Sequence, residues 1–209
     1  METPRKRPWW RYLRLSVRGL ILVVLAVGGC LGWSLHRARV QRQAVAAIQA
    51  AGGSITYEWD VPGAPSTPGW RRWVAQHVDV DLTSNVVQAW LSPRCSEAEL
   101  ARVAQFDRLE SLDVRDANVT DASMASLGRL TRLRFLDLEN CPITDAALVH
   151  LEALTRLEFL ELDRTPVTDA GLVHLKGLAK LRVLELASTQ VGDAGLASLE
   201  GLADLGHCG

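Results

Sequence analysis

A 24-residue spacing of large apolar residues is the feature of this sequence that most constrains its fold. One such column consists of Phe106, Leu130, Leu154, Leu178 and Leu202, and four further columns keep the same phase without an insertion. Each unit reads LxxLxLxx(A/C/T)x(V/I)TDAxLxxLxxL. Because so short a unit cannot bury its own leucines, neighbouring units must stack to share a core. The chain is therefore predicted to fold as a solenoid of repeats.

The pattern inside one unit predicts a strand followed by a short helix. Leu136 and Leu138 have the two-residue spacing of strand positions that face one side. Thr144 can cap a helix whose first residue, Asp145, complements the positive end of the helix dipole. Leu148 begins a run of leucines at three-residue spacing on one face of that helix. We therefore expect an α/β solenoid, with a parallel sheet on the concave face and short helices on the convex face.

This cycle resembles the leucine-rich-repeat family, in a relaxed form of its cysteine-containing class. That class often has cysteine at the position after the strand, which here holds Ala117, Cys141, Thr165 and Thr189. No F-box-like segment precedes the repeats, so the ubiquitin-ligase role of some members does not carry over. The whole layout is similar to short bacterial membrane-anchored leucine-rich-repeat proteins. This resemblance implies an architecture and a location, but no activity.

We assign residues 82–209 to five repeats, the first of which, 82–105, is degraded. The sequence stops early in a further unit without a polar cap, which leaves two alternatives. Either a partner or a second copy covers the end of the array, or the array is truncated and has no function of its own.

The start of the chain predicts a membrane anchor. Residues 19–35 carry no charge and would span about 26 Å as a helix. Six Lys or Arg precede this run, in the basic tail 1–18, and three follow it, so we expect a cytoplasmic N-terminus and repeats on the exported side, periplasmic or extracellular. A cleaved signal peptide is disfavoured because Arg37 and Arg39 crowd its exit. A lipoprotein signal ending at Cys30 remains an alternative.

Between the anchor and the repeats, residues 36–81 are interpreted as an N-terminal cap. We expect a helix stopped by Gly52-Gly53, a short strand over 54–58 and a Pro/Gly linker over 61–69. The Trp70-Arg71-Arg72-Trp73 stretch either covers the open end of the core, which we favour, or contacts the membrane surface.

Charge and motifs exclude several functions. Residues 1–42 hold nine basic residues and one acid, whereas the rest holds 14 basic and 23 acidic residues, which does not suit a nucleic-acid partner. The cysteines have no zinc spacing, and those in the repeats are expected to be buried free thiols. The repeated His150 and His174 are too few for a metal site. Because no catalytic motif occurs and every acid candidate is copied between repeats, we expect no enzyme, no cofactor and no metal.

The strand positions between the core leucines predict a binding face. Phe135 and Phe159 are the expected apolar anchors, and they lie beside acids at Asp113, Asp137, Glu161, Glu185, Glu139 and Asp163. Like charges on adjacent strands are unfavourable, which favours a basic partner, or a cation, held against these acids. Alternatively, repeat duplication copied a solvated acid, and the basic column Arg108, Arg132, Arg156 and Lys180 neutralises it.

These observations lead to one main hypothesis and two alternatives. We expect a non-catalytic, membrane-anchored protein–protein interaction module that binds a protein or peptide on the concave face. The alternatives are a structural protein that self-associates into a homo-oligomer through its uncapped C-terminal end, and an accessory subunit of a partner enzyme.

Overall fold

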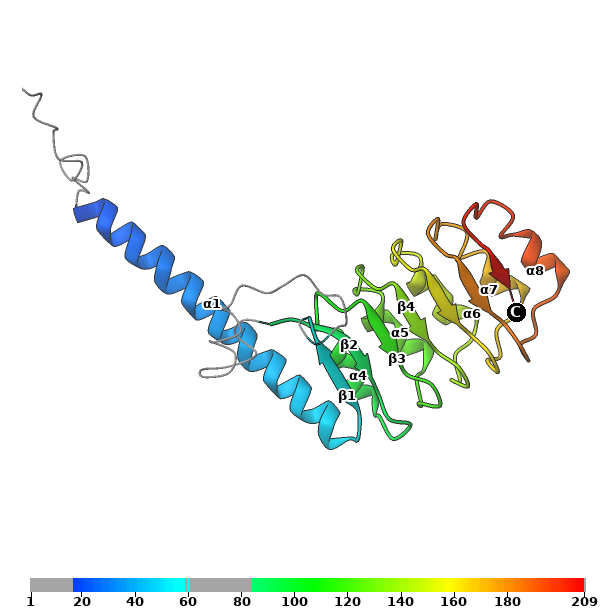
Figure 1. Ribbon diagram of the computed structural model, residues 1–209, viewed down its shortest axis with the longest axis horizontal. Coiled ribbons are helices and arrows are strands. Elements are labelled where there is room, and N and C mark those ends of the chain that lie inside the picture. Colours follow the sequence, from blue (N-terminus) through cyan, green and yellow to red (C-terminus); the bar gives the residue numbers. More distant parts are fainter. Residues whose placement is uncertain (1–16, 59, 61–83, 209) are drawn as a thin grey trace, which may run out of the picture.

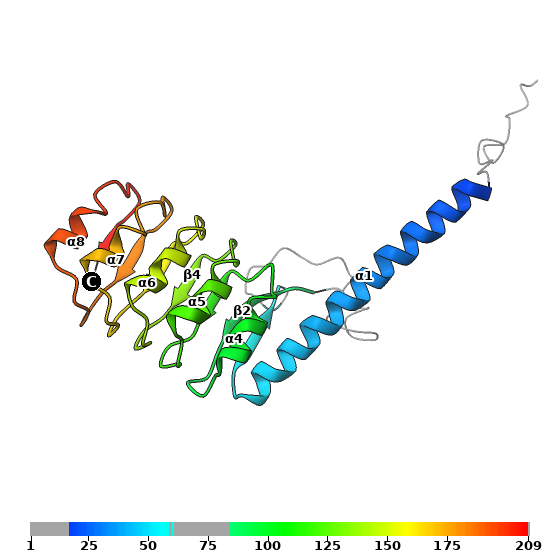
Figure 2. The same cartoon turned by 180° about the vertical axis from the view of Figure 1, so that it is seen from behind.

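The repeats build a curved sheet on one side of the molecule and a row of short helices on the other (Figures 1 and 2). The computed structural model describes residues 17–58, 60 and 84–208. The elements are α1 (Val17–Ala50), β1 (Ser54–Tyr57), β2 (Val86–Trp90), α4 (Glu97–Val103), β3 (Ser111–Asp113), α5 (Asp121–Leu127), β4 (Phe135–Asp137), α6 (Asp145–Leu148), the 3-10 helix η2 (Val149–Leu151), β5 (Phe159–Glu161), α7 (Asp169–Leu172), β6 (Val183–Glu185), α8 (Asp193–Ala197) and β7 (His207–Cys208).

The sheet has seven strands in chain order, which is the arrangement expected of stacked repeats. From β2 to β7 all neighbours are parallel, and Leu112, Leu136, Leu160 and Leu184 pair in register. The predicted α/β solenoid is thus confirmed. At the N-terminal edge β1, which follows α1 after a tight turn, runs antiparallel to β2.

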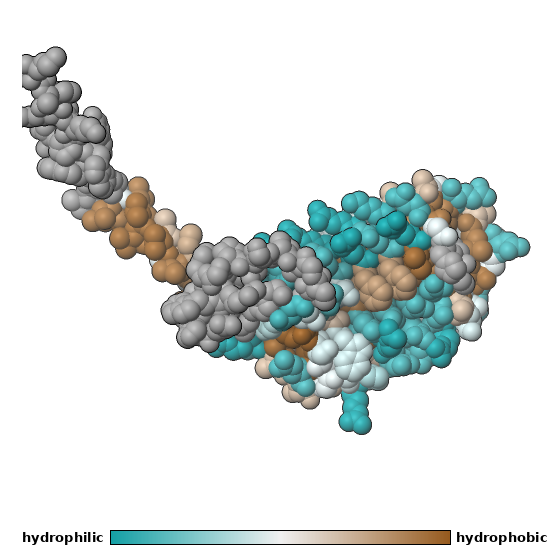
Figure 3. Space-filling model, in the orientation of Figure 1, coloured by the Kyte–Doolittle hydropathy of each residue, from teal (hydrophilic) through white to brown (hydrophobic). Residues whose placement is uncertain are grey.

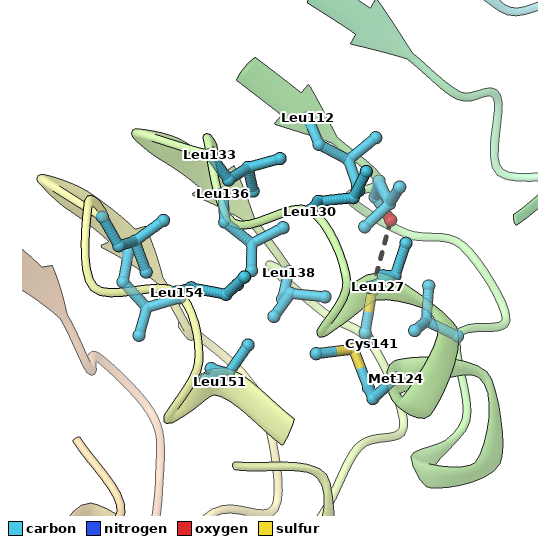
Figure 4. Close-up of a cluster of buried hydrophobic side chains, with 14 of the residues drawn as sticks. Leu112, Met124, Leu127, Leu130, Leu133, Leu136, Leu138, Cys141, Leu151 and Leu154 are labelled. Atoms are coloured by element: carbon cyan, nitrogen blue, oxygen red, sulfur yellow. Dashed lines mark hydrogen bonds between the residues drawn. The ribbon is translucent and has the colours of Figure 1, made fainter. Parts of the chain in front are cut away.

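The core is the continuous column of leucines that the period predicts. Leu136, Leu160 and Leu184 are fully buried, together with the helix leucines that pack on them. Figure 4 shows how leucines from neighbouring repeats meet around Cys141 and Met124. The buried Cys141 donates from Sγ to the carbonyl oxygen of Val114, 3.2 Å away. Cys95 and Cys141 are therefore buried free thiols, as expected.

Helix α1 has two halves with different surroundings. From Leu20 to Leu35 it is apolar and mostly exposed, and the segment Gly19–Ala50 is long and apolar enough to cross a membrane. Its second half packs on the first repeat through Ala38, Ala44, Val45 and Ile48, all of them buried. Together with the buried Gln41 they lie at positions 38, 41, 44/45 and 48, about one helical turn apart, so they form one face that closes the N-terminal end of the core.

This closure by α1 and β1 is what the structure shows of the predicted N-terminal cap. The linker 61–69 and the Trp70–Trp73 stretch lie outside the described residues, as does the basic tail up to residue 16. Gly52 has a φ of 84°, so the turn that ends α1 uses a conformation that glycine adopts without strain.

A candidate binding face on the sheet

The exposed side of the sheet carries three columns of side chains. Strand pairing aligns Ser111, Phe135, Phe159 and Val183, which we call the apolar column. It also aligns Asp113, Asp137, Glu161 and Glu185, which we call the acidic column. Two residues further along the chain lie Arg115, Glu139, Asp163 and Ala187, which we call the outer column. The register therefore brings the predicted site residues together on one face.

Phe135 and Phe159 form the centre of the apolar column. Their rings are stacked, with centroids 4.6 Å apart and planes inclined by 12°. Both residues are half-buried, because each ring covers one face of the other. In Figure 3 an apolar strip runs across this side of the solenoid between hydrophilic residues. Stacked aromatic side chains whose remaining faces meet water are typical anchors for a partner.

Asp137 is the most enclosed member of the acidic column, with 2% of its surface exposed. Arg115 lies 2.6 Å from Asp137 and 3.0 Å from Asp113, so that one guanidinium bridges two repeats. Glu139 pairs in the same way with Arg164 of the next repeat. The ion pairs recorded for Asp113, Asp137 and Glu139 therefore come from residues after the strands. The alternative in which the basic column before the strands neutralises the acidic column does not describe Asp113 and Asp137, because their partner is Arg115.

Asp137 and Glu161, in the middle of the acidic column, bind protons more tightly than isolated carboxylates do. Burial, together with the charge of Asp113, raises the pKa of Asp137 to about 6, although Arg115 opposes this shift. Burial and the charges of Asp163, Asp137 and Glu185 raise the pKa of Glu161 to about 7. Among the described residues no ion pair reaches Glu161. The middle of the face therefore holds negative charge that its own cations compensate only in part.

Trp90 belongs to this face and was not identified from the sequence. It pairs with Asp113 in the register and is 38% exposed, so it occupies the acidic-column position of the first repeat. The distance between these two residues is 23 positions instead of 24, and a strict period would place Trp90 in the core. The available signal was the alternation of Val87, Ala89 and Leu91, which are all buried.

The remaining candidates do not form sites. His174 Nδ1 lies 2.6 Å from Glu152 on the helix side, while His150 is half-buried one repeat earlier. Within residues 17–58, 60 and 84–208 no cluster of three or more metal-ligating side chains occurs. Open hollows lie beside the apolar column, and one of about 470 Å³ is lined by Phe159, Val183 and Arg182 among others.

Repeated strand–turn–helix units with a leucine core define a leucine-rich-repeat solenoid, and the chain is similar to the leucine-rich-repeat family. The family model described as "Leucine Rich repeat" matches residues 177–199, which is one unit of the array. Solenoids of this kind present an extended concave surface that such proteins use for binding.

Several solved leucine-rich-repeat structures are similar to the chain. Internalin C2 from Listeria monocytogenes str. 4b F2365 is 25% identical with a TM-score of 0.47, over 52% of this chain and 45% of that chain. An internalin F from the same strain is 21% identical with a TM-score of 0.38, over 52% and 36%. The ectodomain of the Arabidopsis thaliana receptor kinase GASSHO1/SCHENGEN3, solved in complex with CASPARIAN STRIP INTEGRITY FACTOR 2, is 20% identical with a TM-score of 0.36, over 55% and 14%. The chain thus spans less than half the length of each. No curated protein sequence matches it.

Proposed function

We propose that this protein is a membrane-anchored, non-catalytic interaction module that binds a polypeptide partner on the exposed side of its sheet. The observation that carries the proposal is the stacked Phe135–Phe159 pair beside the acidic column. An apolar centre with charged surroundings is the usual anatomy of a protein-binding surface. The face extends along the whole array and does not enclose a pocket, so it suits an extended polypeptide segment better than a small molecule.

The partner carries basic side chains where it meets the acidic column. Asp137 and Glu161 hold partly compensated charge next to an apolar surface that a partner would cover. A lysine or arginine placed there would replace lost hydration by an ion pair, while an acidic segment would be repelled. Trp90 adds an exposed ring at the N-terminal end of the same column, which can hold a cation or an aliphatic side chain.

The exposed half of α1 supports the anchoring. Leu20, Leu22, Leu25 and Leu31 are each more than half exposed, which is costly in water and favourable in lipid. The excess of basic residues before this segment supports a cytoplasmic N-terminus and an exported array. The partner is then a protein or peptide on the exported side.

Photo-crosslinking in native membranes tests this function. A photoreactive amino acid would replace Phe135 or Phe159, and a matched control would replace Glu152, which is exposed on the helix side. We expect one discrete protein adduct from the sheet positions and none from the control. An adduct of twice the chain's mass would instead indicate self-association through this face. The same adducts from all three positions, or none from folded protein, would contradict the proposed binding face.

A further inference from the structure

We propose that the edge of the solenoid that precedes the strands lies against the anionic headgroups of the membrane that α1 spans. This pre-strand edge consists of residues 104–110, 128–134, 152–158 and 176–182, which join each helix to the next strand. The inference rests on the proposed membrane anchoring, and it adds a lipid-contacting surface to the repeats themselves.

The first argument is the direction in which α1 passes the first repeat. Arg37, two residues after the apolar run, donates to Asn85 Oδ1 at 3.0 Å and to Asp107 Oδ1 at 2.6 Å. Both acceptors precede a strand, at the starts of β2 and β3. Gln41, one turn later, donates to the carbonyl oxygen of Ser84 at 3.1 Å. The part of α1 just after the membrane segment, around Arg37 and Gln41, is therefore fixed to the side of the first repeats that precedes the strands.

The other end of α1 lies at the opposite edge. The helix ends at Ala50, and Ser54 then pairs with Trp90 at the C-terminal end of β2. Because α1 is one uninterrupted helix, the membrane lies on the side of the pre-strand edge. In Figures 1 and 2 the repeats extend sideways from α1, and the exposed half of the helix projects beyond this edge.

The second argument is the charge of the two edges. The pre-strand edge holds eight Lys or Arg and four Asp or Glu, and two of these acids, Asp107 and Glu158, are paired with arginines. The post-strand edge, residues 114–121, 138–145, 162–169 and 186–193, holds two arginines and seven acids. The basic edge thus faces the membrane and the acidic edge faces away. Where the facing leaflet contains anionic lipid, exposed basic residues near its surface are attracted by about 1 kcal/mol each.

The pre-strand edge also offers room for a headgroup. An open hollow of about 350 Å³ is lined by Arg134, Lys180 and Arg182, with Glu158 and Asp204 completing its wall. Arg132 and Arg156 are exposed at the same repeat position as Lys180. Arg132, Arg156 and Lys180 are therefore open to a lipid phosphate, whereas Arg134 already pairs with Glu158. The sheet face stands beside the membrane in this arrangement, so it stays accessible to a partner.

The test is depth-dependent fluorescence quenching of the full chain in vesicles. A genetically encoded fluorescent residue would replace Thr155 on the pre-strand edge or Asn118 on the post-strand edge, both of which are exposed. The vesicles contain phosphatidylcholine, alone or with phosphatidylglycerol, and a lipid with a nitroxide on its headgroup. We expect stronger quenching at Thr155 than at Asn118, and a difference that grows with phosphatidylglycerol and shrinks in high salt.

A charge variant and a matched control sharpen this test. The charge variant combines Arg132→Gln, Arg156→Gln and Lys180→Gln. It should lose the part of the quenching at position 155 that depends on phosphatidylglycerol. Each substitution should weaken the preference of this edge for anionic lipid about fivefold. The control carries Ala122→Glu, Ala146→Glu and Ala170→Glu, which change the net charge equally on exposed residues in the first turns of α5, α6 and α7, directly after the post-strand edge. This control should leave the quenching at position 155 unchanged.

The outcomes separate the two proposals. Equal quenching at Thr155 and Asn118 in protein that stays with the vesicles after a high-salt wash would overturn the lipid-facing edge and leave the anchor intact. Loss of the wild-type chain from the vesicles in that wash would overturn the anchoring and with it this inference. A glutamine variant that behaves like the wild type would also overturn the role of the three cations.

Discussion

Asp145 accepts two hydrogen bonds from Thr168 of the following repeat, one from its backbone nitrogen at 2.8 Å and one from its Oγ1 at 2.6 Å. Asp121 and Thr144 repeat this geometry at 2.8 Å and 2.7 Å. The Thr-Asp pair that begins each helix therefore has two functions. Its threonine caps its own helix, as predicted for Thr144, and its aspartate holds the next repeat in register.

Removal of this link should weaken the stacking of repeats. Asp145→Ala leaves the backbone nitrogen and hydroxyl of Thr168 without their acceptor, and hydrogen bonds to a carboxylate are strong, so we expect a loss of about 2 kcal/mol in the free energy of unfolding. Urea unfolding of the full chain in detergent, followed by circular dichroism, measures this loss. Asp193→Ala is the control, because within the described residues Asp193 accepts no such bond. Equal losses in the two variants would contradict a role in stacking.

The raised pKa of Glu161 predicts that the unfolding free energy falls as the pH rises. The pKa of Glu161 is raised from 4.5 to about 7, so the folded state holds this proton more tightly than the unfolded state does. The contribution is therefore fully present below about pH 4.5 and is lost as the pH rises through 7. Glu161→Gln removes the cost of ionisation and should stabilise the protein by about 1 kcal/mol at pH 8, a value reduced for partial solvent exposure.

The measurement for Glu161→Gln is the unfolding free energy at several pH values from 4.5 to 8. We expect the variant and the wild type to agree near pH 4.5, to separate progressively as the pH rises towards 7, and to differ by a constant amount above that. Glu200→Gln, at an exposed position outside the column, should follow the wild type throughout. If the difference in unfolding free energy between Glu161→Gln and the wild type does not change with pH, ionisation of Glu161 costs the folded state nothing, and the prediction is wrong.

The period of the leucines made most of the fold predictable, because each core position repeats. The period could not predict contacts between neighbouring repeats in which the two partners occupy different positions of the repeat unit. The Asp145–Thr168 link spans 23 residues and joins two side chains that local helix rules explain separately. Trp90 was missed because the first repeat has one residue fewer between its strand and the next.

The turns after the strands also escaped prediction. Asp116, Asn140, Arg164 and Ser188 all have a positive φ, between 53° and 60°, at one position per repeat. Asparagine and aspartate adopt this conformation more readily than most residues, but arginine and serine give no such signal. The columns of the sheet face, in contrast, followed directly from strand alternation. The partners in their ion pairs did not follow from it, because a long arginine side chain can reach an acid in the preceding or the following repeat.

Helix α1 should stabilise the first repeats more than the last ones. Ile48 is fully buried at the N-terminal end of the core, and Ile48→Ala removes a side chain that the solenoid cannot easily replace, at a cost of about 3 kcal/mol. Hydrogen exchange followed by mass spectrometry should detect faster exchange in β1, β2 and α4, with less change in β6. Gln49→Ala, at an exposed neighbour, is the control. Uniform loosening of all repeats would indicate that α1 does not act as a local cap.

Phe159 allows binding to be separated from folding. Phe159→Ala removes a half-buried ring that stacks on Phe135, so we expect a modest loss of about 1 kcal/mol in the unfolding free energy. Leu160→Ala, one residue further, removes a fully buried core side chain and should cost about 3 kcal/mol. The yield of the partner adduct formed from a photoreactive residue at Phe135 is then compared in the two variants at a temperature where both are folded. The yield should fall strongly in Phe159→Ala and much less in Leu160→Ala, because only the first variant alters the face that the partner covers; a larger fall in Leu160→Ala would assign the effect to stability.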